Sequence, residues 1–276
     1  MSTELATNRD SGGDGPVLSS LARGLDDRGC VGLAQVLSVA QLCTRFDLKY
    51  LVPVEALPAL IDRLPRQLAA LDIDGLRIFR YESVYFDTDD FALYRQHVQD
   101  RRKRYKARTR SYCDSGDTMF DVKLKGPRGQ TVKERLPYDF ERRHELTVSG
   151  RGFLDMVVAD AYGTTVPPLR TALTTGYRRA TLVDLEHEAR LTIDVNLSWS
   201  DQKSNHRADH LALIESKSFW GPRPVDALLV SMAVRPVRMS KYCVGVALLH
   251  PDLAANPWNR LLRRQFGWQR AADPCY

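Results

Sequence analysis

The sequence lacks the features of secreted, membrane-spanning and common nucleotide-binding proteins. Its five cysteines stand singly along 276 residues, which argues against both a disulfide framework and a zinc-binding spacing. No apolar run approaches the ~20 residues that a spanning helix needs, and the polar first residues contain no signal-peptide core. Neither G-x-x-x-x-G-K-[ST] nor G-x-G-x-x-G occurs. We therefore expect a cytoplasmic protein without an integral membrane segment, whose nucleotide site is neither a P-loop nor a Rossmann crevice.

What is present is a globular composition with a basic balance. Hydrophobic residues make up 43% of the chain and charged residues 27%, which is enough for a sizeable core in one large domain or two small ones. The net charge of +6 and the pI of about 9.1 favour an anionic partner without identifying it.

Residues 101–110 (RRKRYKARTR) are strongly basic, because seven of the ten are Lys or Arg. In the second half of this stretch Lys106, Arg108 and Arg110 alternate with small residues. In a β-strand these three cations share one face. Such a run is also typical of a solvated face, a localisation signal or a nucleic-acid-binding patch. The pattern becomes specific only if other strands repeat it.

Charged residues alternate in the same way elsewhere in the chain. The stretches are 45–49, 121–125, 131–135, 190–194 and 215–217, and Arg179 lies on a further predicted strand. Several such strands suggest a sheet closed into a barrel, because closure gives every strand an inner face. We therefore expect an α+β fold with a closed eight-stranded antiparallel β-barrel and flanking helices. This domain is expected over residues 38–250, after a flexible leader (1–37) and before a C-terminal tail (251–276).

A barrel interior rich in Lys and Arg is unstable when empty, because like charges away from water repel strongly. A phosphate chain would neutralise it, and such chains travel with Mg²⁺ or Mn²⁺, which prefer oxygen ligands. We therefore predict that Glu215 binds the metal, helped by Asp47, Asp121 or Asp194. The alternative is that these acids only pair with neighbouring cations. The alternation also predicts phosphate binding by Lys106, Arg135 and Lys217.

Nine short motifs occur in an order that resembles a known family. They are R-F-D-L-K-Y, S-V-Y-F-D-T, K-A-R-T-R, D-V-K, V-K-E-R, Y-R-R, R-L-T-I-D, I-E-S-K and S-K-Y-C-V-G. The series resembles the VTC-type polyphosphate polymerase domain, one of the triphosphate tunnel metalloenzymes and a relative of the CYTH proteins. The resemblance covers residues 42–250.

The resemblance implies an antiparallel tunnel that binds ATP or another nucleoside triphosphate, or polyphosphate, together with Mn²⁺ or Mg²⁺. The implied phosphate ligands are Lys49, Arg108, Arg110, Lys123, Lys133, Arg179 and Lys241. Tyr177 and Ser240 are implied as hydrogen-bond donors and Glu215 as the metal ligand. Catalytic roles are expected for Arg108, Arg110, Lys241 and Glu215. Asp47 and Asp121 stand where related sequences usually carry Glu, which shortens their reach by one methylene.

The expected reaction is ATP-driven polyphosphate synthesis, which depends on positioning and charge neutralisation. An inorganic triphosphatase of the CYTH type would use the same tunnel with water as the nucleophile. A non-catalytic polyphosphate-binding module would bind the chain without turning over ATP. A nucleic-acid binder is a further alternative, but the basic strand has few stacking aromatics, so no nucleic acid is expected. Tyr81, Tyr85 and Phe86 are predicted to be core residues.

Overall fold

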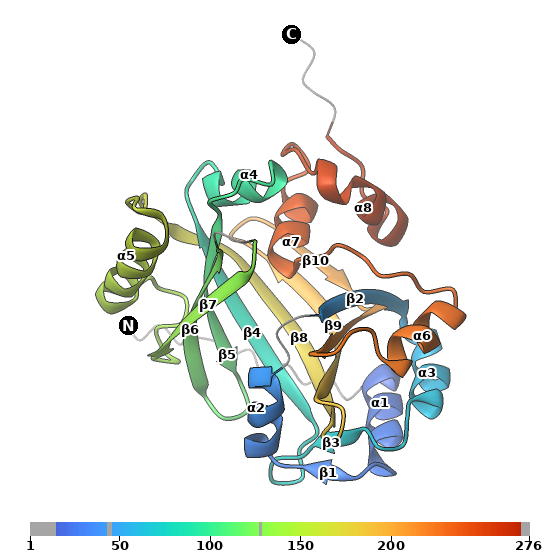
Figure 1. The fold of residues 1–276 in the computed structure, drawn as a ribbon. Helices are drawn as coiled ribbons and strands as arrows, with labels where there is room; N and C mark the ends of the chain where they lie inside the picture. Colours follow the sequence, from blue (N-terminus) through green and yellow to red (C-terminus); the bar gives the residue numbers. More distant parts are fainter. Residues whose placement is uncertain (1–14, 43–45, 127–128, 272–276) are drawn as a thin grey trace, which may run out of the picture.

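The computed structural model describes residues 15–42, 46–126 and 129–271, and its eleven strands belong to one sheet (Figure 1). Eight strands follow one antiparallel path. In spatial order they are β2 (Phe46–Pro53), β11 (Leu211–Ser218), β9 (Ala189–Ser200), β8 (Arg170–Asp184), β4 (Ile78–Asp87), β5 (Tyr105–Tyr112), β6 (Asp117–Lys125) and β7 (Thr131–Tyr138). Three short strands lie off this path: β1 (Cys30–Val31), β3 (Ala69–Leu71) and β10 (Asn205–Ala208). The expected mixed α+β class is confirmed.

The expected closure of the sheet into a barrel is wrong. Strands β2 and β7 end the path, and no ladder joins them within the described ranges. Strand β7 carries Pro137 and the cations Lys133 and Arg135, and both features oppose pairing at a sheet edge. The sheet nevertheless curls, and this brings Lys123 on β6 close enough to Lys49 on β2 for their charges to interact. The result is an open sheet with a concave and a convex face.

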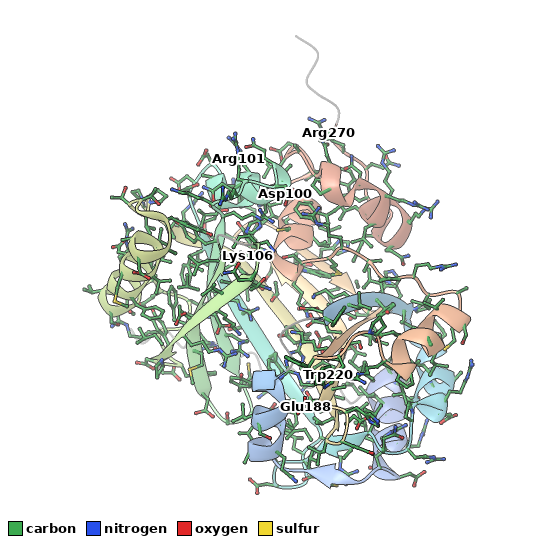
Figure 2. The ribbon with its side chains drawn as sticks, viewed as in Figure 1. Asp100, Arg101, Lys106, Glu188, Trp220 and Arg270 are labelled. Carbon is green, nitrogen blue, oxygen red and sulfur yellow. The ribbon has the colours of Figure 1, made fainter. Side chains whose placement is uncertain are left out.

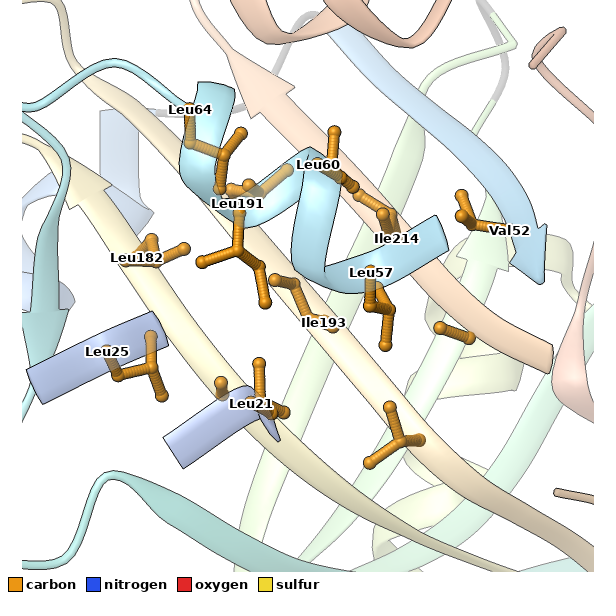
Figure 3. Close-up of a cluster of buried hydrophobic side chains, with 14 of the residues drawn as sticks. Leu21, Leu25, Val52, Leu57, Leu60, Leu64, Leu182, Leu191, Ile193 and Ile214 are labelled. Carbon is orange, nitrogen blue, oxygen red and sulfur yellow. The ribbon is translucent and has the colours of Figure 1, made fainter. Parts of the chain in front are cut away.

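The convex face is apolar and covered by helices. Alternate residues of β8, β9, β11 and β2 pack there against α1 (Pro16–Asp26), α3 (Leu57–Arg63) and α6 (Pro224–Ser231) (Figure 3). In α1, Leu18, Leu21 and Leu25 recur at helical spacing and are buried, and Pro16 opens the helix. Further along, α5 (Val148–Tyr162) covers β5 and β6. The apolar positions of the strands are thereby used on one face, which leaves the charged positions on the other.

The concave face has a charged middle between two apolar ends. At one end α7 (Lys241–Leu249) packs on aromatic residues of the sheet, including Trp199. At the other end α2 (Leu33–Leu42) places Val36 against Phe79 and Val183. Figure 1 shows the two helices on the same side of the sheet, above and below the middle of β8 and β9.

A change of face within β9 permits this arrangement. Asn196 has a positive φ of 53°, and the pairing of β8 with β9 shifts register nearby. Asp194 before this bulge and Trp199 after it both face the concave side. In a strand without a bulge, these two side chains would face opposite sides of the sheet. One strand therefore supplies a carboxylate to the charged middle and an indole to the packing of α7.

The remaining helices complete the cover of the sheet. They are α4 (Ala92–Val98), α8 (Asn259–Phe266) and the 3-10 turns η1 (Val54–Ala56) and η2 (Asn256–Trp258). The division of the chain at residues 37 and 250 stays a prediction. Residues 1–14 of the expected leader, Arg45, turn residues 127–128 and tail residues 272–276 lie outside the described residues. Among the described helices, none has both the length and the apolar character required to cross a bilayer.

Candidate phosphate-binding site

Three neighbouring strands place their charged residues in register on the concave face. Arg108 on β5 lies directly opposite Asp121 on β6, which lies opposite Arg135 on β7. One step along the same strands, Lys106, Lys123 and Lys133 form a second row in the same order. Directly paired residues of an antiparallel sheet point to the same side. The alternation predicted from the sequence therefore produces two adjacent rows of cations.

Asp121 is the only carboxylate in these two rows, and four cations surround it. Its oxygens lie 3.0 Å from Arg108 Nη2, 3.0 Å from Arg110 Nε, 3.4 Å from Lys133 Nζ and 3.5 Å from Arg135 Nε. The Asp121 side chain is 1% exposed, whereas that of Arg135 is 53% exposed. We define these five residues as the Asp121 cluster. Its cations outnumber its carboxylate, so most of their charge is not neutralised within the cluster.

Burial and the crowding of cations displace the pKa values of Asp121, Lys133 and the neighbouring Lys123. Burial acts to raise the pKa of Asp121, but Arg108, Arg110 and Lys133 outweigh it and hold the pKa below its usual range. Burial and then the charges of Arg110 and Arg108 lower the pKa of Lys133 to about 6. Partial desolvation of Lys123, followed by repulsion from Lys106 and Lys49, lowers its pKa to about 8. These lysines gain protons readily when an anion is placed beside them.

The other half of the concave face is built around Asp194 on β9. Arg179 on β8 donates two hydrogen bonds to this carboxylate, of 2.6 Å from Nε and 2.8 Å from Nη2. Lys241, the first residue of α7, donates a third hydrogen bond to Asp194. The Tyr177 ring packs against both cations, with its centroid 5.1 Å from Arg179 Cζ and 4.3 Å from Lys241 Nζ. Residues far apart in the chain are thereby joined at one carboxylate.

Glu215 on β11 lies beside Asp194 within the same set of charges. It pairs across the ladder with Lys49, and its carboxylate is 3.4 Å from Lys217 Nζ. Lys217 also reaches Asp47 at 3.6 Å, and Lys49 is paired with Asp47. Burial acts to raise the pKa of Glu215, but Lys217, Lys49 and other cations together hold it well below its usual range. Glu215 is therefore an ionised oxygen donor.

We define the second group, the Asp194–Glu215 cluster, as the residues around these two carboxylates. Its members are Asp194, Glu215, Asp47, Arg179, Lys241, Lys217 and Lys49. Here three carboxylates accompany four cations. The cluster is therefore much closer to neutrality than the Asp121 cluster.

The start of α7 connects the Asp194–Glu215 cluster to the Lys106–Lys123 row. Ser240 caps the helix by accepting a hydrogen bond from the Cys243 amide, and its hydroxyl also accepts one of 2.7 Å from Lys106 Nζ. The Trp199 indole donates to the Lys241 carbonyl at 2.9 Å, which fixes the helix on the sheet. The first turn of α7 thus directs its free amide groups, which favour anions, toward the charged middle.

All the predicted site residues lie on or against the concave face. The structure groups them into the two clusters and the Lys106–Lys123 row, with Tyr177 and Ser240 in contact with these groups. Their functional roles stay predictions. The sequence predicts Tyr85 as a core residue, and it is buried, but its hydroxyl also accepts a hydrogen bond of 2.9 Å from Arg108. The sequence interpretation did not include Tyr112, whose hydroxyl accepts a hydrogen bond of 2.7 Å from Arg110. A signal for the role of Tyr85 existed, because Val84 and Phe86 on either side of it pack under α5, which places Tyr85 on the face of β4 that also carries the charged residues.

The carboxylates of the concave face can hold a divalent ion only if phosphate oxygens complete its coordination. No group of three His, Cys, Asp or Glu side chains with suitable spacing occurs in the parts of the chain that the structure describes. Asp121 and Asp194 are already enclosed by cations. Mg²⁺ commonly binds one or two carboxylates together with substrate phosphates. Glu215 fits that mode, because its closest cation is 3.4 Å away and its oxygens are less fully engaged.

Comparison with known families gives a match over most of the chain. A family model described as the VTC domain matches residues 44–250. No curated protein matches the sequence. The matched range begins near the start of β2 and ends just after α7, so it contains both clusters.

Solved structures show a weaker likeness. A putative adenylyl cyclase from Hippeastrum, described as having a dominant triphosphatase activity, has a TM-score of 0.44 and 16% identity over 72% of this chain and 93% of its own. A protein from Pyrococcus horikoshii OT3 has a TM-score of 0.33 and 14% identity over 68% of this chain and 86% of its own. Because these scores are below 0.5, the family assignment depends on the sequence match alone. On that match, the chain belongs to the VTC domain family.

Proposed function

We propose that the concave face binds the phosphates of ATP and of polyphosphate and transfers phosphoryl groups to a growing polyphosphate chain. The observation that supports this proposal is the excess of cations on the concave face. Four cations share Asp121, and Lys106 and Lys123 add a second row beside it. A linear anion with a charge on every unit matches a row of cations better than a compact ligand does.

In this proposal Arg108 and Arg110 neutralise the transferred phosphate. Tyr85 and Tyr112 hold the two guanidinium groups in place, and Asp121 fixes their direction. Preorganised donors of this kind stabilise charge in the transition state without having to move. Lys241 and the first turn of α7 hold the terminal phosphate of the growing chain, so that one of its oxygens attacks the γ-phosphorus of ATP in line while the bond to the β-phosphate breaks and ADP leaves.

Glu215 is the proposed ligand for Mn²⁺ or Mg²⁺. When bound there together with phosphate oxygens, the ion would supply further positive charge against the phosphates. Lys49 and Lys217 keep Glu215 ionised across the physiological range and lie on its two sides.

A triphosphatase is the second candidate, and the open sheet is the observation that favours it. In the part of the chain that the structure describes, strands β2 and β7 are not joined, so water can reach the concave face between these edges. Hydrolysis needs a water molecule where synthesis needs the end of a phosphate chain. The two reactions can therefore share the same cations and differ in the nucleophile.

Product analysis tests these alternatives. The purified protein is incubated with ATP and Mn²⁺, and the products are separated by size and assayed for free phosphate. Synthesis gives a ladder of long chains, and hydrolysis gives free phosphate without chains. Binding of polyphosphate with neither product would contradict both catalytic proposals and leave a binding module. Binding of duplex DNA in preference to tripolyphosphate would contradict the proposed substrate class.

A further inference from the structure

The convex face contains a cavity that the proposed function does not use. Its volume is about 210 Å³, and it lies where the turn between β8 and β9 meets the start of α6. Two of its lining residues, Leu191 on β9 and Ser216 on β11, are directly paired and therefore point to the same side of the sheet. Glu215 is the neighbour of Ser216 on β11, so it points to the opposite, concave side. The sheet thus separates this cavity from the two clusters.

Most of the cavity lining is apolar. Leu68 follows α3 and Val225 lies in the first turn of α6, and together with Leu191 they belong to the buried core of the convex face. Ala189, at the start of β9, contributes only a methyl group and so leaves room beside it. Binding sites for small molecules are typically apolar, with a few polar groups that orient the ligand.

The cavity lies at an end of the molecule that is remote from the Lys106–Lys123 row. Arg223 Nη2 donates a hydrogen bond of 2.9 Å to the His187 carbonyl, which joins the segment before α6 to the turn between β8 and β9. Figure 2 shows Trp220 of this segment close to Glu188 of this turn, well below Lys106 in the view. Both Arg223 and His187 line the cavity.

Arg223 brings a positive charge to this apolar lining. Within the described parts of the chain, its guanidinium group forms no ion pair, and its buried Nε has no hydrogen-bond partner. Asp184 also lines the cavity, but its carboxylate is already engaged by His187. The His187 amide donates to Oδ1 at 3.0 Å, and the ring Nδ1 lies 3.0 Å from Oδ2. The charge of Arg223 is therefore available to a ligand.

We propose that this cavity binds a small organic carboxylate. The carboxylate accepts hydrogen bonds from Arg223, and the apolar body of the ligand packs against Leu68, Leu191 and Val225. A guanidinium group suits this ligand because its planar donors match the two oxygens of a carboxylate. A polyphosphate does not fit, since one cation cannot balance its many charges and Asp184 repels them. This site is independent of the proposed function, which concerns the other face of the sheet.

A matched pair of ligands tests the site. Phenylacetate and the neutral phenylethanol share an apolar body and differ in the carboxylate, and binding of each to the full chain is followed by NMR titration. The wild-type protein should bind phenylacetate about tenfold more tightly, the effect of one charge-assisted contact. Arg223→Gln should remove this preference and leave the affinity for phenylethanol within about twofold. The amide signals that shift should include those of Leu68 and Val225.

Gln67→Glu is a second variant, chosen because Gln67 is an exposed residue of the lining. The added negative charge should weaken phenylacetate binding several-fold and spare phenylethanol. Arg66→Gln is the matched control, because it removes an exposed charge next to Gln67 but outside the lining. It should leave both affinities nearly unchanged, and thermal unfolding of each variant checks the fold.

Several outcomes would overturn the site. They are failure of the wild-type protein to bind phenylacetate, equal affinity for the two ligands, no effect of Gln67→Glu, and equal effects of Arg223→Gln and Arg66→Gln. Displacement of phenylacetate by tripolyphosphate would also overturn it, because that result would place the carboxylate among the cations of the concave face. Failure of the protein to bind tripolyphosphate would instead contradict the proposed function and leave this site unaffected.

Discussion

The Asp121 cluster and the Asp194–Glu215 cluster occupy the same concave face, yet their charge balance differs. The first is made by β5, β6 and β7 and gives one carboxylate to four cations. The second is made by β8, β9, β11, β2 and the start of α7, and it gives three carboxylates to four cations. Both are held in place by direct cross-strand pairs.

This difference suggests a division of tasks between the two halves. The surplus of positive charge in the Asp121 cluster suits the anchoring of phosphates. The near neutrality of the other cluster suits an ion that is shared between Glu215 and the phosphates. A single uniform lining of cations would attract an anion without orienting it. Two unlike halves would give a bound phosphate chain a direction.

The largest effect that would test this comparison is on stability. Asp121→Asn should lower the free energy of unfolding by about 3–5 kcal/mol, because it leaves Arg108, Arg110 and Arg135 without a buried counter-charge. Asp47→Asn, at a 40% exposed carboxylate, should cost less than about 1 kcal/mol. Urea denaturation measures both. Tripolyphosphate should restore part of the stability of Asp121→Asn by mass action. Equal losses in the two variants would contradict the central role of Asp121.

The next effect is on the reaction itself. Arg108→Ala should reduce the rate with ATP and Mn²⁺ about 100-fold or more, because one preorganised contact to a developing charge contributes ~3 kcal/mol. Arg80→Ala is the matched control, since Arg80 lies on the other face of β4 with a side chain that is 54% exposed. It should react at nearly the wild-type rate. A rate near wild type for Arg108→Ala would show that the anchoring half is misassigned.

A smaller effect separates the metal from the phosphates. Glu215→Gln should raise the Mn²⁺ concentration that gives half-maximal rate about tenfold, as expected for the loss of one charged contact. Asp121→Asn should not raise it, because the Asp121 carboxylate is fully occupied by cations. Titration of the rate with Mn²⁺ at saturating ATP measures this. If the two substitutions have the same effect, the division between the clusters fails.

The smallest effect concerns the pH dependence of Lys133. An unfolded lysine has a pKa of ~10.4, whereas Lys133 in the folded chain has one of about 6. Between these two pKa values Lys133 binds more protons in the unfolded chain than in the folded one. Its contribution to the free energy of unfolding therefore rises with pH. Lys133→Met should flatten this rise and stabilise the ligand-free protein by about 1 kcal/mol near pH 6, allowing for its partial exposure.

Proton uptake provides the corresponding binding experiment. A phosphate anion beside Lys133 raises its pKa, so binding of tripolyphosphate near pH 7 should take up protons. Calorimetry in two buffers of different ionisation enthalpy measures that uptake, and Lys133→Met should reduce it. Unchanged uptake in this variant would show that the anion binds away from the Asp121 cluster.

The charged face could be predicted from the sequence because alternation is a local property. Lys106, Arg108 and Arg110 share a face in any regular strand, and the structure places them so. The order of motifs likewise predicted the family. The openness of the sheet could not be predicted, since pairing of β2 with β7 depends on the curvature of all the strands between them. The proline and cations of β7 are visible in the sequence but do not identify it as an edge.

The sequence also could not predict which charged side chains pair with one another. The sequence predicts Asp121 or Asp194 as a helper of Glu215 at a metal, and the structure shows both enclosed by cations. Which acid keeps free oxygens depends on contacts between β8, β9 and α7 that are distant in the chain. The bulge at Asn196 decides the face of Trp199, and no simple alternation reveals it.

The most direct test of the account is a crystal structure of the protein with Mn²⁺ and a non-hydrolysable ATP analogue. The account predicts density for the triphosphate on the concave face, in contact with Arg108 and Arg110, and an anomalous peak beside Glu215. Triphosphate density bound only on the convex face or at the outer surface, with the two clusters still paired to themselves, would contradict it.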